Sequence, residues 1–343
     1  MKLLNQDFKK AMQGYKAVKT ICKSAKMTFC GDETVIQSED VELSYGHDQD
    51  FDKYITVDEP TLKLMEKCKD DFELSLDSVK SNTKTINYHC DDEHEQFIKD
   101  IPFTKIAEIS QAELLSCIKG VKFATAKDDI RPVLQNILWE NGNFVSVDGF
   151  RVVTKNTTVS PDMSVLFTPT TYTLLEKLLD KKSDEPVKVF LDLDHTDKQY
   201  MAFEFGEVDL ITLAGKGDFL DCKSLMNGDY NLSADINRKE FIEKLEFLQQ
   251  DKAPLVINVT VDKLLLSTRT VSNELMDELN IDLDVNNGSK TDLRIAVNPR
   301  YLIESLKNMT DDVVKMTFTT EVAPMTIIHS GGKDLILPVR LKG

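Results

Sequence analysis

Residues 292–318, DLRIAVNPRYLIESLKNMTDDVVKMTF, contain the pattern that decides the fold. The apolar stretch Leu293–Val297 is followed by Asn298-Pro299, by an amphipathic stretch over 300–308, and by the alternating stretch Val313–Phe318. Asn favours the capping position of a helix, and Pro in the first turn loses no useful N–H group. Apolar residues at helical spacing across 300–308 predict one buried helix face. The pattern therefore predicts a strand, a helix and a strand.

The same unit occurs twice more along the chain. Thr168-Pro169 follows the apolar Val165–Phe167 and precedes a strand-like stretch at 187–191. Asp58-Glu59-Pro60 follows Ile55-Thr56-Val57, with its capping residue one position further from the proline. The three prolines are 109 and 130 residues apart.

A second helical pattern lies upstream of each unit and keeps nearly the same spacing. These patterns start at Asn5, Ser110 and Asn237, which are 105 and 127 residues apart. Ser110-x-x-Glu113 and Asn237-x-x-Glu240 have the form of capping boxes. Two markers in step predict three similar domains rather than a solenoid of short repeats. The predicted domains cover residues 1–104, 105–229 and 230–343, and the predicted fold class is α+β.

Strand signals fill the rest of each domain. In the first domain, short alternating stretches predict strands at 27–29, 35–37 and 41–45. In the second, Asn141-Gly142 is a hairpin signal between strand-like residues 130–139 and 144–153. Near the C-terminus, residues 330–333 are expected to form a hairpin turn.

Composition places the chain among globular proteins. It has 343 residues, 41% of them hydrophobic, and no apolar run approaches 18 residues, so we expect no membrane span. The N-terminus lacks an apolar signal core, and six cysteines without paired spacing fit a reducing cytoplasm. The formal charge of −16 does not exclude nucleic acid as a partner, because 42 Lys and Arg residues can gather on one face of an acidic body.

Two clusters are candidates for metal chemistry. His89 and His94 flank three acidic residues, and Asp192, Asp194, His195 and Asp197 resemble a fragment of a calcium loop. Neither has a complete ligand pattern, so we interpret them as a solvated acidic hairpin and a strand running into a turn. A metal-dependent enzyme stays open as an alternative. We expect no catalytic residues, no metal and no cofactor, and interpret the chain as a non-catalytic binding protein.

Cationic side chains recur at similar places in the predicted helices and lie off their apolar stripes. Ordinary solvated helix faces are one interpretation, since Glu66, Glu176 and Glu304 lie nearby. Recurrence in three domains favours a surface that contacts DNA phosphates without reading sequence. The predicted DNA-facing residues are Lys9, Lys10, Lys63, Lys67, Lys119, Lys122, Lys127, Arg131, Lys177, Lys181, Arg238, Lys239, Arg300 and Lys307.

Three motifs, in order, resemble the bacterial DNA polymerase III beta subunit, the ring-shaped sliding clamp. The first is DDIRPVL at 128–134, followed after a short hairpin by VDGFRV at 147–152. The second is Val297-Asn298-x-x-Tyr301-Leu302, and the third is LPVRL at 337–341. The resemblance covers residues 105–341 well and the first 104 weakly.

The resemblance implies three clamp domains, each with two helices packed on antiparallel sheets. Two chains would close head to tail into a six-domain ring that encircles duplex DNA. The ring would tether a DNA polymerase and meet a clamp loader through a short linear peptide. The alternative is a monomeric clamp-like protein that binds partners without encircling DNA.

The family binds partner peptides in a cleft between the second and third domains. The resemblance implies that aliphatic side chains supply burial there, while Arg151, Arg340 and Tyr301 orient the peptide. The residues carried over by motif are Leu134, Gly149, Phe150, Arg151, Val152, Met226, Asn298, Tyr301, Val322, Pro324, Leu335, Ile336, Leu337, Pro338, Val339, Arg340 and Leu341.

Overall fold

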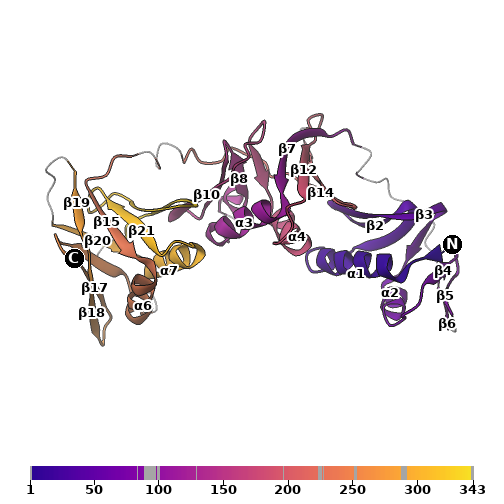
Figure 1. Cartoon of the computed structure of the whole chain (residues 1–343), viewed down its shortest axis with the longest axis horizontal. Coiled ribbons are helices and arrows are strands. Elements are labelled where there is room, and N and C mark those ends of the chain that lie inside the picture. Colours follow the sequence, from indigo (N-terminus) through magenta and orange to yellow (C-terminus); the bar gives the residue numbers. More distant parts are fainter. Residues whose placement is uncertain are drawn as a thin grey trace. The chain divides into compact units, whose positions relative to one another are not determined.

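The computed structural model divides into two compact units. Figure 1 shows the helices and strands, coloured along the sequence. Unit 1 comprises Met1–Ser116 and Val159–Lys216, and unit 2 comprises Cys117–Thr158 and Gly217–Gly343. The structure describes residues 2–82, 84–88, 98, 101–128, 130–195, 197–222, 226, 228–250, 253–286 and 292–340. The boundaries of the three predicted domains stay a prediction.

Unit 1 contains two antiparallel sheets. The larger has the order β2-β3-β14-β13-β12-β7 and the smaller the order β1-β4-β5-β6. The strands of the larger sheet are β2 (Lys26–Ser38), β3 (Val41–Val57), β14 (Val208–Leu213), β13 (Tyr200–Phe205), β12 (Pro186–Leu191) and β7 (Thr104–Ser110). The smaller sheet has β1 (Lys2–Leu3), β4 (Phe72–Leu74), β5 (Ser78–Ser81) and β6 (Lys84–Asn87), and β11 (Val165–Phe167) lies outside both.

The strands β2 and β3 are longer than the short strands predicted for this region. They pair along most of their length, with register shifts on both sides of Gly31. Gly31 has φ of +50°, a left-handed conformation that glycine adopts at little cost. The bulges let polar residues such as Asp32 and Glu33 remain in one continuous strand, although in sequence they look like a loop.

Helices cover the sheets of unit 1. They are α1 (Asn5–Lys19), α2 (Glu59–Met65) and α4 (Pro169–Leu178), and α1 packs against β2, β3 and α4. Phe8, Met12 and Tyr15 are buried on α1, as their spacing predicts. The helix α3 (Gln111–Val121) runs from unit 1 into unit 2.

The three predicted capping residues precede their prolines as expected. Asp58 Oδ1 accepts from Thr61 N at 3.1 Å, Thr168 Oγ1 accepts from Thr171 N at 3.2 Å, and Asn298 Oδ1 accepts from Arg300 N at 3.0 Å. Each satisfies one of the backbone donors that a helix leaves open in its first turn. The predicted strand–cap–helix units are thus confirmed at all three places.

Unit 2 also contains two antiparallel sheets. The larger runs β8-β9-β10-β23-β22-β21-β15-β19 within the unit, and the smaller runs β18-β17-β16-β20. The larger sheet contains β8 (Ile137–Glu140), β9 (Asn143–Val147), β10 (Arg151–Asn156), β23 (Gly332–Ile336), β22 (Met325–His329), β21 (Val313–Phe318), β15 (Leu232–Asn237) and β19 (Leu283–Val285). The smaller contains β18 (Glu274–Asn280), β17 (Lys263–Arg269), β16 (Leu255–Val259) and β20 (Leu293–Val297).

Two helices, α6 (Arg238–Leu248) and α7 (Pro299–Asn308), contact each other in unit 2. Their apolar faces enter one core, which includes Phe241, Leu302 and Leu306. Two short 3₁₀ helices precede the sheet, namely η2 (Lys122–Ala124) and η3 (Pro132–Gln135). The prediction of strand throughout 130–139 was therefore wrong in its first half.

The two predicted hairpins are present. Asn141 and Gly142 join β8 to β9 with φ of +48° and +71°, the left-handed pair that an Asn-Gly turn favours. The turn after His329 joins β22 to β23. Throughout the described residues, no helix has the length and apolar composition needed to cross a membrane.

Candidate partner-peptide cleft and cationic helices

A tight turn sets the directions of two neighbouring side chains at the start of β10. Asp148 Oδ1 accepts the N–H groups of Phe150 at 3.0 Å and Arg151 at 3.1 Å, and Gly149 has φ of +86°. After this turn Phe150 is 57% exposed, whereas Arg151 is 4% exposed. The turn thus presents an aromatic ring to solvent and directs a cation inward.

Two of the three guanidinium nitrogens of Arg151 are held by groups of its own chain, and the third, Nη1, is buried without a hydrogen-bond partner among the described residues. Its Nε donates to Asp148 Oδ2 at 2.9 Å, and its Nη2 donates to Phe123 O at 3.0 Å and lies 2.7 Å from Glu304 Oε2. Its Cζ lies 5.0 Å from the ring centre of Phe123 and 4.7 Å from that of Tyr301. Arg151 therefore ties the start of β10 to α7, and its predicted role in orienting a peptide stays a prediction.

The carboxylate of Glu304 is the counter-ion on α7. Burial acts to raise its pKa, but hydrogen bonds from Arg300 and Arg151 outweigh burial and lower the pKa overall. Burial raises the pKa of the neighbouring Tyr301 hydroxyl, and the charge of Asp148 adds to that shift. Glu304 is therefore ionised and Tyr301 neutral near neutral pH, which favours the ion pair.

An exposed apolar surface lies beside this ion pair. The ring of Phe150 stacks on Tyr301 with centroids 5.9 Å apart and an interplanar angle of 19°. The C-terminal segment follows: Leu337 N donates to Phe150 O at 2.9 Å, and Val339 N donates to Ala296 O at 2.7 Å. Phe150, Leu337, Val339 and Val322 are all among the exposed large apolar residues. Exposed apolar groups around a hydrogen-bonded backbone are suited to contact with a peptide.

Other predicted cleft residues are buried beneath this surface. Val152 pairs with Leu335 across β10 and β23, and these residues are 4% and 3% exposed. Leu134 is 3% exposed, and Ile336 belongs to the core of unit 2. Of the rest, Gly149 and Arg340 are exposed, Leu341 lies outside the described residues, and those half-buried are Met226, Asn298, Pro324 and Pro338.

Sequence reasoning missed Phe123 and Glu304 as partners of Arg151. Glu304 has a sequence signal, because it lies four residues after Arg300 and forms an i,i+4 ion pair with it at 2.7 Å. Phe123 has none, since its contribution is a backbone carbonyl and a ring face in a short 3₁₀ helix.

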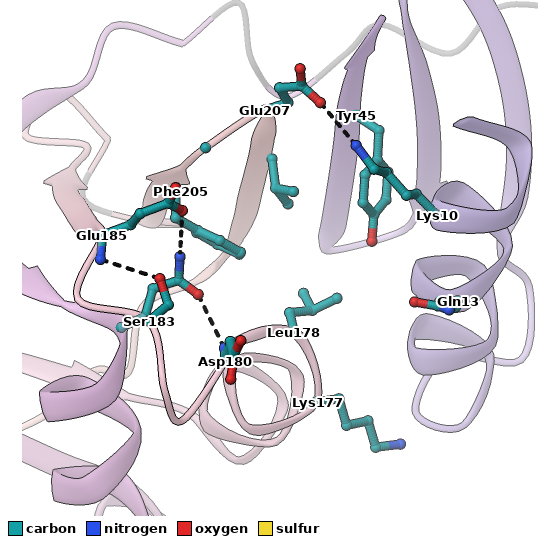
Figure 2. A pocket seen from close by; sticks show the side chains of 13 residues that line it. Lys10, Gln13, Tyr45, Lys177, Leu178, Asp180, Ser183, Glu185, Phe205 and Glu207 are labelled. Atoms are coloured by element: carbon teal, nitrogen blue, oxygen red, sulfur yellow. Dashed lines mark hydrogen bonds and ion pairs between the residues drawn. The ribbon is translucent and has the colours of Figure 1, made fainter. Parts of the chain in front are cut away.

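In unit 1, several predicted DNA-facing lysines have intramolecular partners. Figure 2 shows Lys10 of α1 directed at Glu207, with Nζ 3.1 Å from Oε2, beside a polar hollow that Lys177 of α4 also lines. Lys177 donates to Thr20 Oγ1, and Lys63 lies 2.8 Å from Glu59. These contacts favour the interpretation of solvated helix faces for these particular lysines.

In unit 2, several predicted DNA-facing side chains also have partners within the chain. Arg300 pairs with Glu304, Lys307 with Glu246 at 2.5 Å and Lys239 with Asp312 at 2.9 Å. Arg238 donates to Leu306 O at 3.1 Å and to the carbonyl of Asp311. Lys122 is half-buried. In the two units together, the remaining predicted DNA-facing residues are exposed and form no ion pair among the described residues: Lys9, Lys67, Lys119, Lys127, Arg131 and Lys181.

The candidate metal clusters give no metal centre in the described part of the chain. Asp192 is fully buried, and its Oδ1 accepts from Asp194 N at 3.0 Å and His195 N at 3.2 Å, which is a closed turn. Within the described ranges no group of three or more His, Cys, Asp or Glu side chains is arranged to hold a metal. His89 and His94 lie outside those ranges.

The chain is similar in sequence to one known protein family and to several of its members. Residues 225–340 match the family described as DNA polymerase III beta subunit, C-terminal domain. The beta sliding clamp of Staphylococcus aureus is 23% identical over 246 residues, covering 68% of this chain. That of Staphylococcus epidermidis is 23% identical over 249 residues. The chain spans 63% of the length of these relatives.

Solved structures match over nearly the whole chain. A putative DNA polymerase III beta subunit from Eubacterium rectale has a TM-score of 0.82 at 18% identity, and the DNA polymerase sliding clamp from Bacillus subtilis has 0.80 at 17%. A sliding clamp from Bartonella birtlesii bound to griselimycin has 0.80 at 18%, and all three matches cover 99% of both chains. The predicted clamp fold and resemblance are confirmed.

Proposed function

We propose that this chain, which has the fold of the DNA polymerase III beta subunits, is a non-catalytic DNA sliding clamp. Two copies form a ring around duplex DNA in the cytoplasm, and the exposed apolar surface around Phe150 and Leu337 holds a short peptide of a DNA polymerase or clamp loader. The observation that carries this proposal is a strand pairing that occurs twice within the chain.

In unit 1, β14 pairs with β3, from Val208 opposite Tyr45 to Thr212 opposite Val41. In unit 2, β23 pairs with β10, with Leu335 opposite Val152. Each time, the last strand of one predicted domain pairs with the strand that ends the sheet of the predicted domain before it. The third pair of equivalent strands is β6 of the first domain and β18 of the third, and each is an end strand of its sheet. Pairing β6 with β18 of a second copy extends the pattern and closes the ring head to tail.

The chemistry of the two edges supports this pairing. The β18 edge carries Glu274, Asp277 and Glu278, and Met276 on it is 68% exposed. Asp277 also pairs with Lys244 at 3.2 Å and Glu278 with Lys263 at 2.8 Å, which leaves Glu274 as the carboxylate with no such pair among the described residues. At the unit 1 edge, Lys84 lies on the end strand β6 and Lys80 lies on its neighbour β5. An exposed edge strand has backbone groups ready to pair with another chain, and opposite charges select the partner.

The proposed peptide surface is supported by exposed apolar side chains on elements that an ion pair holds in place. Phe150, Leu337 and Val339 offer apolar area to solvent, while the Arg151–Glu304 ion pair fixes the elements that carry them. A peptide needs only to supply apolar side chains and main-chain hydrogen bonds to gain affinity at such a place.

Sedimentation or light-scattering mass tests the ring. We expect a mass near twice the 38.9 kDa of one chain. Glu274→Lys with Glu278→Lys should shift the equilibrium toward monomer at low salt, and adding Lys80→Glu with Lys84→Glu should restore the dimer. The matched control, Glu39→Lys with Glu321→Lys, changes the charge equally outside the edges and should leave the mass unchanged. A monomeric wild type would contradict the ring and favour the alternative of a clamp-like interaction protein.

A further inference from the structure

The two strand junctions within the chain can be aligned residue by residue from a close contact that each contains. Gly14 of α1 and Gly120 of α3 each lie nine residues after the first residue of their helix. A Cβ atom at Gly14 would collide with the hydroxyl of Tyr45 on β3, and one at Gly120 would lie 3.4 Å from the side chain of Lys155 on β10. Tyr45 and Lys155 are therefore equivalent positions.

This alignment gives the proposed peptide surface of unit 2 a counterpart in unit 1. On β14, Ile211 lies opposite Glu42, just as Leu335 on β23 lies opposite Val152. Side chains alternate along a strand and Tyr45 faces α1, so Glu42 faces away from that helix. Counting along the strands from these pairs, the equivalents of Phe150, Val322 and Leu337 are, in that order, Asp40, Lys198 and Leu213. These three residues, with Glu42 and Ile211, define the counterpart surface.

The rim of the counterpart surface is charged where the proposed peptide surface is apolar. Phe150 and Val322 are 57% and 80% exposed. Their equivalents, Asp40 and Lys198, form an ion pair, and Lys198 Nζ lies 5.8 Å from the ring centre of Tyr200. Hydrogen bonds to Asp40 and then Tyr200 raise the pKa of Lys198, so its ammonium group stays charged near neutral pH. An ion pair therefore stands at the positions that expose apolar side chains in unit 2.

Apolar side chains of the same chain cover the counterpart surface. Ile98, Ile101 and Phe103 pack against a buried cluster on β13 and β14. Ala202 belongs to this cluster and is 8% exposed, whereas its equivalent on β22, Thr326, is half-buried. The counterpart surface is thus filled from within the chain.

The main chain of this covering segment is held as well. Ile98 N donates to Glu42 Oε2 at 2.6 Å, and Glu42 is 1% exposed. Glu42 is the equivalent of Val152, so a buried acceptor replaces an apolar side chain there. A bound peptide gains affinity from the same two sources, which are buried apolar side chains and main-chain hydrogen bonds.

We propose that the junction of β3 with β14 carries a second peptide surface, which Ile98, Ile101 and Phe103 occupy in cis. This inference rests on the proposed function, since it takes the surface around Phe150 and Leu337 as the peptide surface. The occupant directly precedes β7 in the same chain, so it competes at an effective concentration on the order of millimolar. A partner peptide at a much lower concentration is therefore excluded from unit 1.

Cysteine labelling of the folded protein tests the closure without a peptide. A maleimide should label Thr326→Cys about tenfold faster than its equivalent Ala202→Cys, because a packed residue reacts only through local opening. Wild-type protein supplies the background from the native cysteines. Equal labelling rates at the two positions would overturn the closure.

Removing apolar groups from the occupant should open the counterpart surface. Ile98→Ser with Ile101→Ser should raise the labelling rate of Ala202→Cys by about tenfold. Leu64→Ser with Leu76→Ser changes two exposed positions of unit 1, so this matched control should leave the rate unchanged. An unchanged rate after the isoleucine changes would also overturn the proposal.

Peptide stoichiometry tests whether the opened surface binds a peptide. A peptide selected on the wild type from a phage-displayed random library should bind once per chain in titration calorimetry. Adding Asp40→Phe with Lys198→Val to Ile98→Ser with Ile101→Ser should give two per chain, and the retained first site shows that this variant is folded. One per chain in that variant, or two in the wild type, would overturn this inference and leave the proposed function standing. Peptide binding to the wild type that Leu337→Asp leaves unchanged would overturn both.

Discussion

The Nη2 atom of Arg151 lies 2.7 Å from Glu304 Oε2, so the start of β10 and the middle of α7 are joined by an ion pair that is nearly closed to solvent on the arginine side. The pair links segments from the predicted second and third domains. It also stands directly behind the Phe150 and Tyr301 rings. Its integrity therefore decides both the stability of unit 2 and the shape of the proposed peptide surface.

Arg151→Met should lower the free energy of unfolding by about 3–5 kcal/mol, because it leaves Asp148 and Glu304 without their shared buried partner. Urea denaturation followed by circular dichroism measures this loss. Arg300→Ala is the matched control, since it breaks an ion pair to the same Glu304 from a side chain 60% exposed. Its cost should be about 0–1 kcal/mol. Equal losses for the two variants would contradict a stabilising role special to Arg151.

Leu337→Asp should weaken binding of a short linear peptide from a DNA polymerase or clamp loader by more than about tenfold, because it places a charge on an apolar contact surface. Fluorescence anisotropy with labelled peptide measures the affinity. Val261→Asp is the control, because Val261 is exposed elsewhere in unit 2. This variant should bind the peptide as the wild type does. Unchanged affinity of the Leu337 variant would remove the C-terminal segment from the peptide surface.

Exposed lysines without an ion pair should contribute more to DNA binding than paired ones. Lys119→Ala should reduce the slope of log K against log salt by about one, as expected for one phosphate contact. Lys239→Ala should reduce it less, because Lys239 Nζ lies 2.9 Å from Asp312 and that pair must open first. Filter binding to a short duplex between 50 and 200 mM salt supplies the slopes. A larger change in slope for Lys239→Ala than for Lys119→Ala would contradict the greater role assigned to lysines without an ion pair.

Glu59 gives a pH prediction with a definite sign. Hydrogen bonds from Lys63 and Lys19 lower the pKa of its carboxyl from 4.5 to about 2. A pKa lowered on folding means that the ionised group stabilises the folded state above pH 4.5, and this contribution is lost as pH falls from 4.5 towards 2. An NMR titration of the side-chain carboxyl should show a midpoint well below 4.5 that rises in Lys19→Met with Lys63→Met. A wild-type midpoint at 4.5 would contradict both ion pairs.

Local chemistry in the sequence was enough to predict the recurring elements of the fold. Cap, proline and apolar stripe act within a few residues, so the helices after Asp58, Thr168 and Asn298 were predicted correctly. The Asn141-Gly142 hairpin was predictable for the same reason. Long strands were not, because pairing across the bulges at Gly31 keeps β2 continuous where the local sequence looks polar.

The candidate site was predictable as a set of residues but not as an arrangement. The structure brings the motif residues Phe150, Tyr301 and Leu337 together, and their role as a peptide site stays a prediction. Sequence could not show that Arg151 forms ion pairs with both Asp148 and Glu304, because Glu304 lies far from Arg151 along the chain. Nor could it show which lysines are paired, because the partner carboxylates, such as Glu207 for Lys10, lie on other elements.

The central claim is that two copies enclose DNA as a ring, and one experiment with a circular duplex tests it most directly. Protein is mixed with a nicked circle at a concentration low enough to favour monomer, then concentrated so that dimers assemble around the DNA. After dilution into high salt, the protein should stay with the circle and leave within minutes once a restriction enzyme cuts it. Equal retention on cut and uncut DNA, or release from both at the same rate, would contradict topological binding.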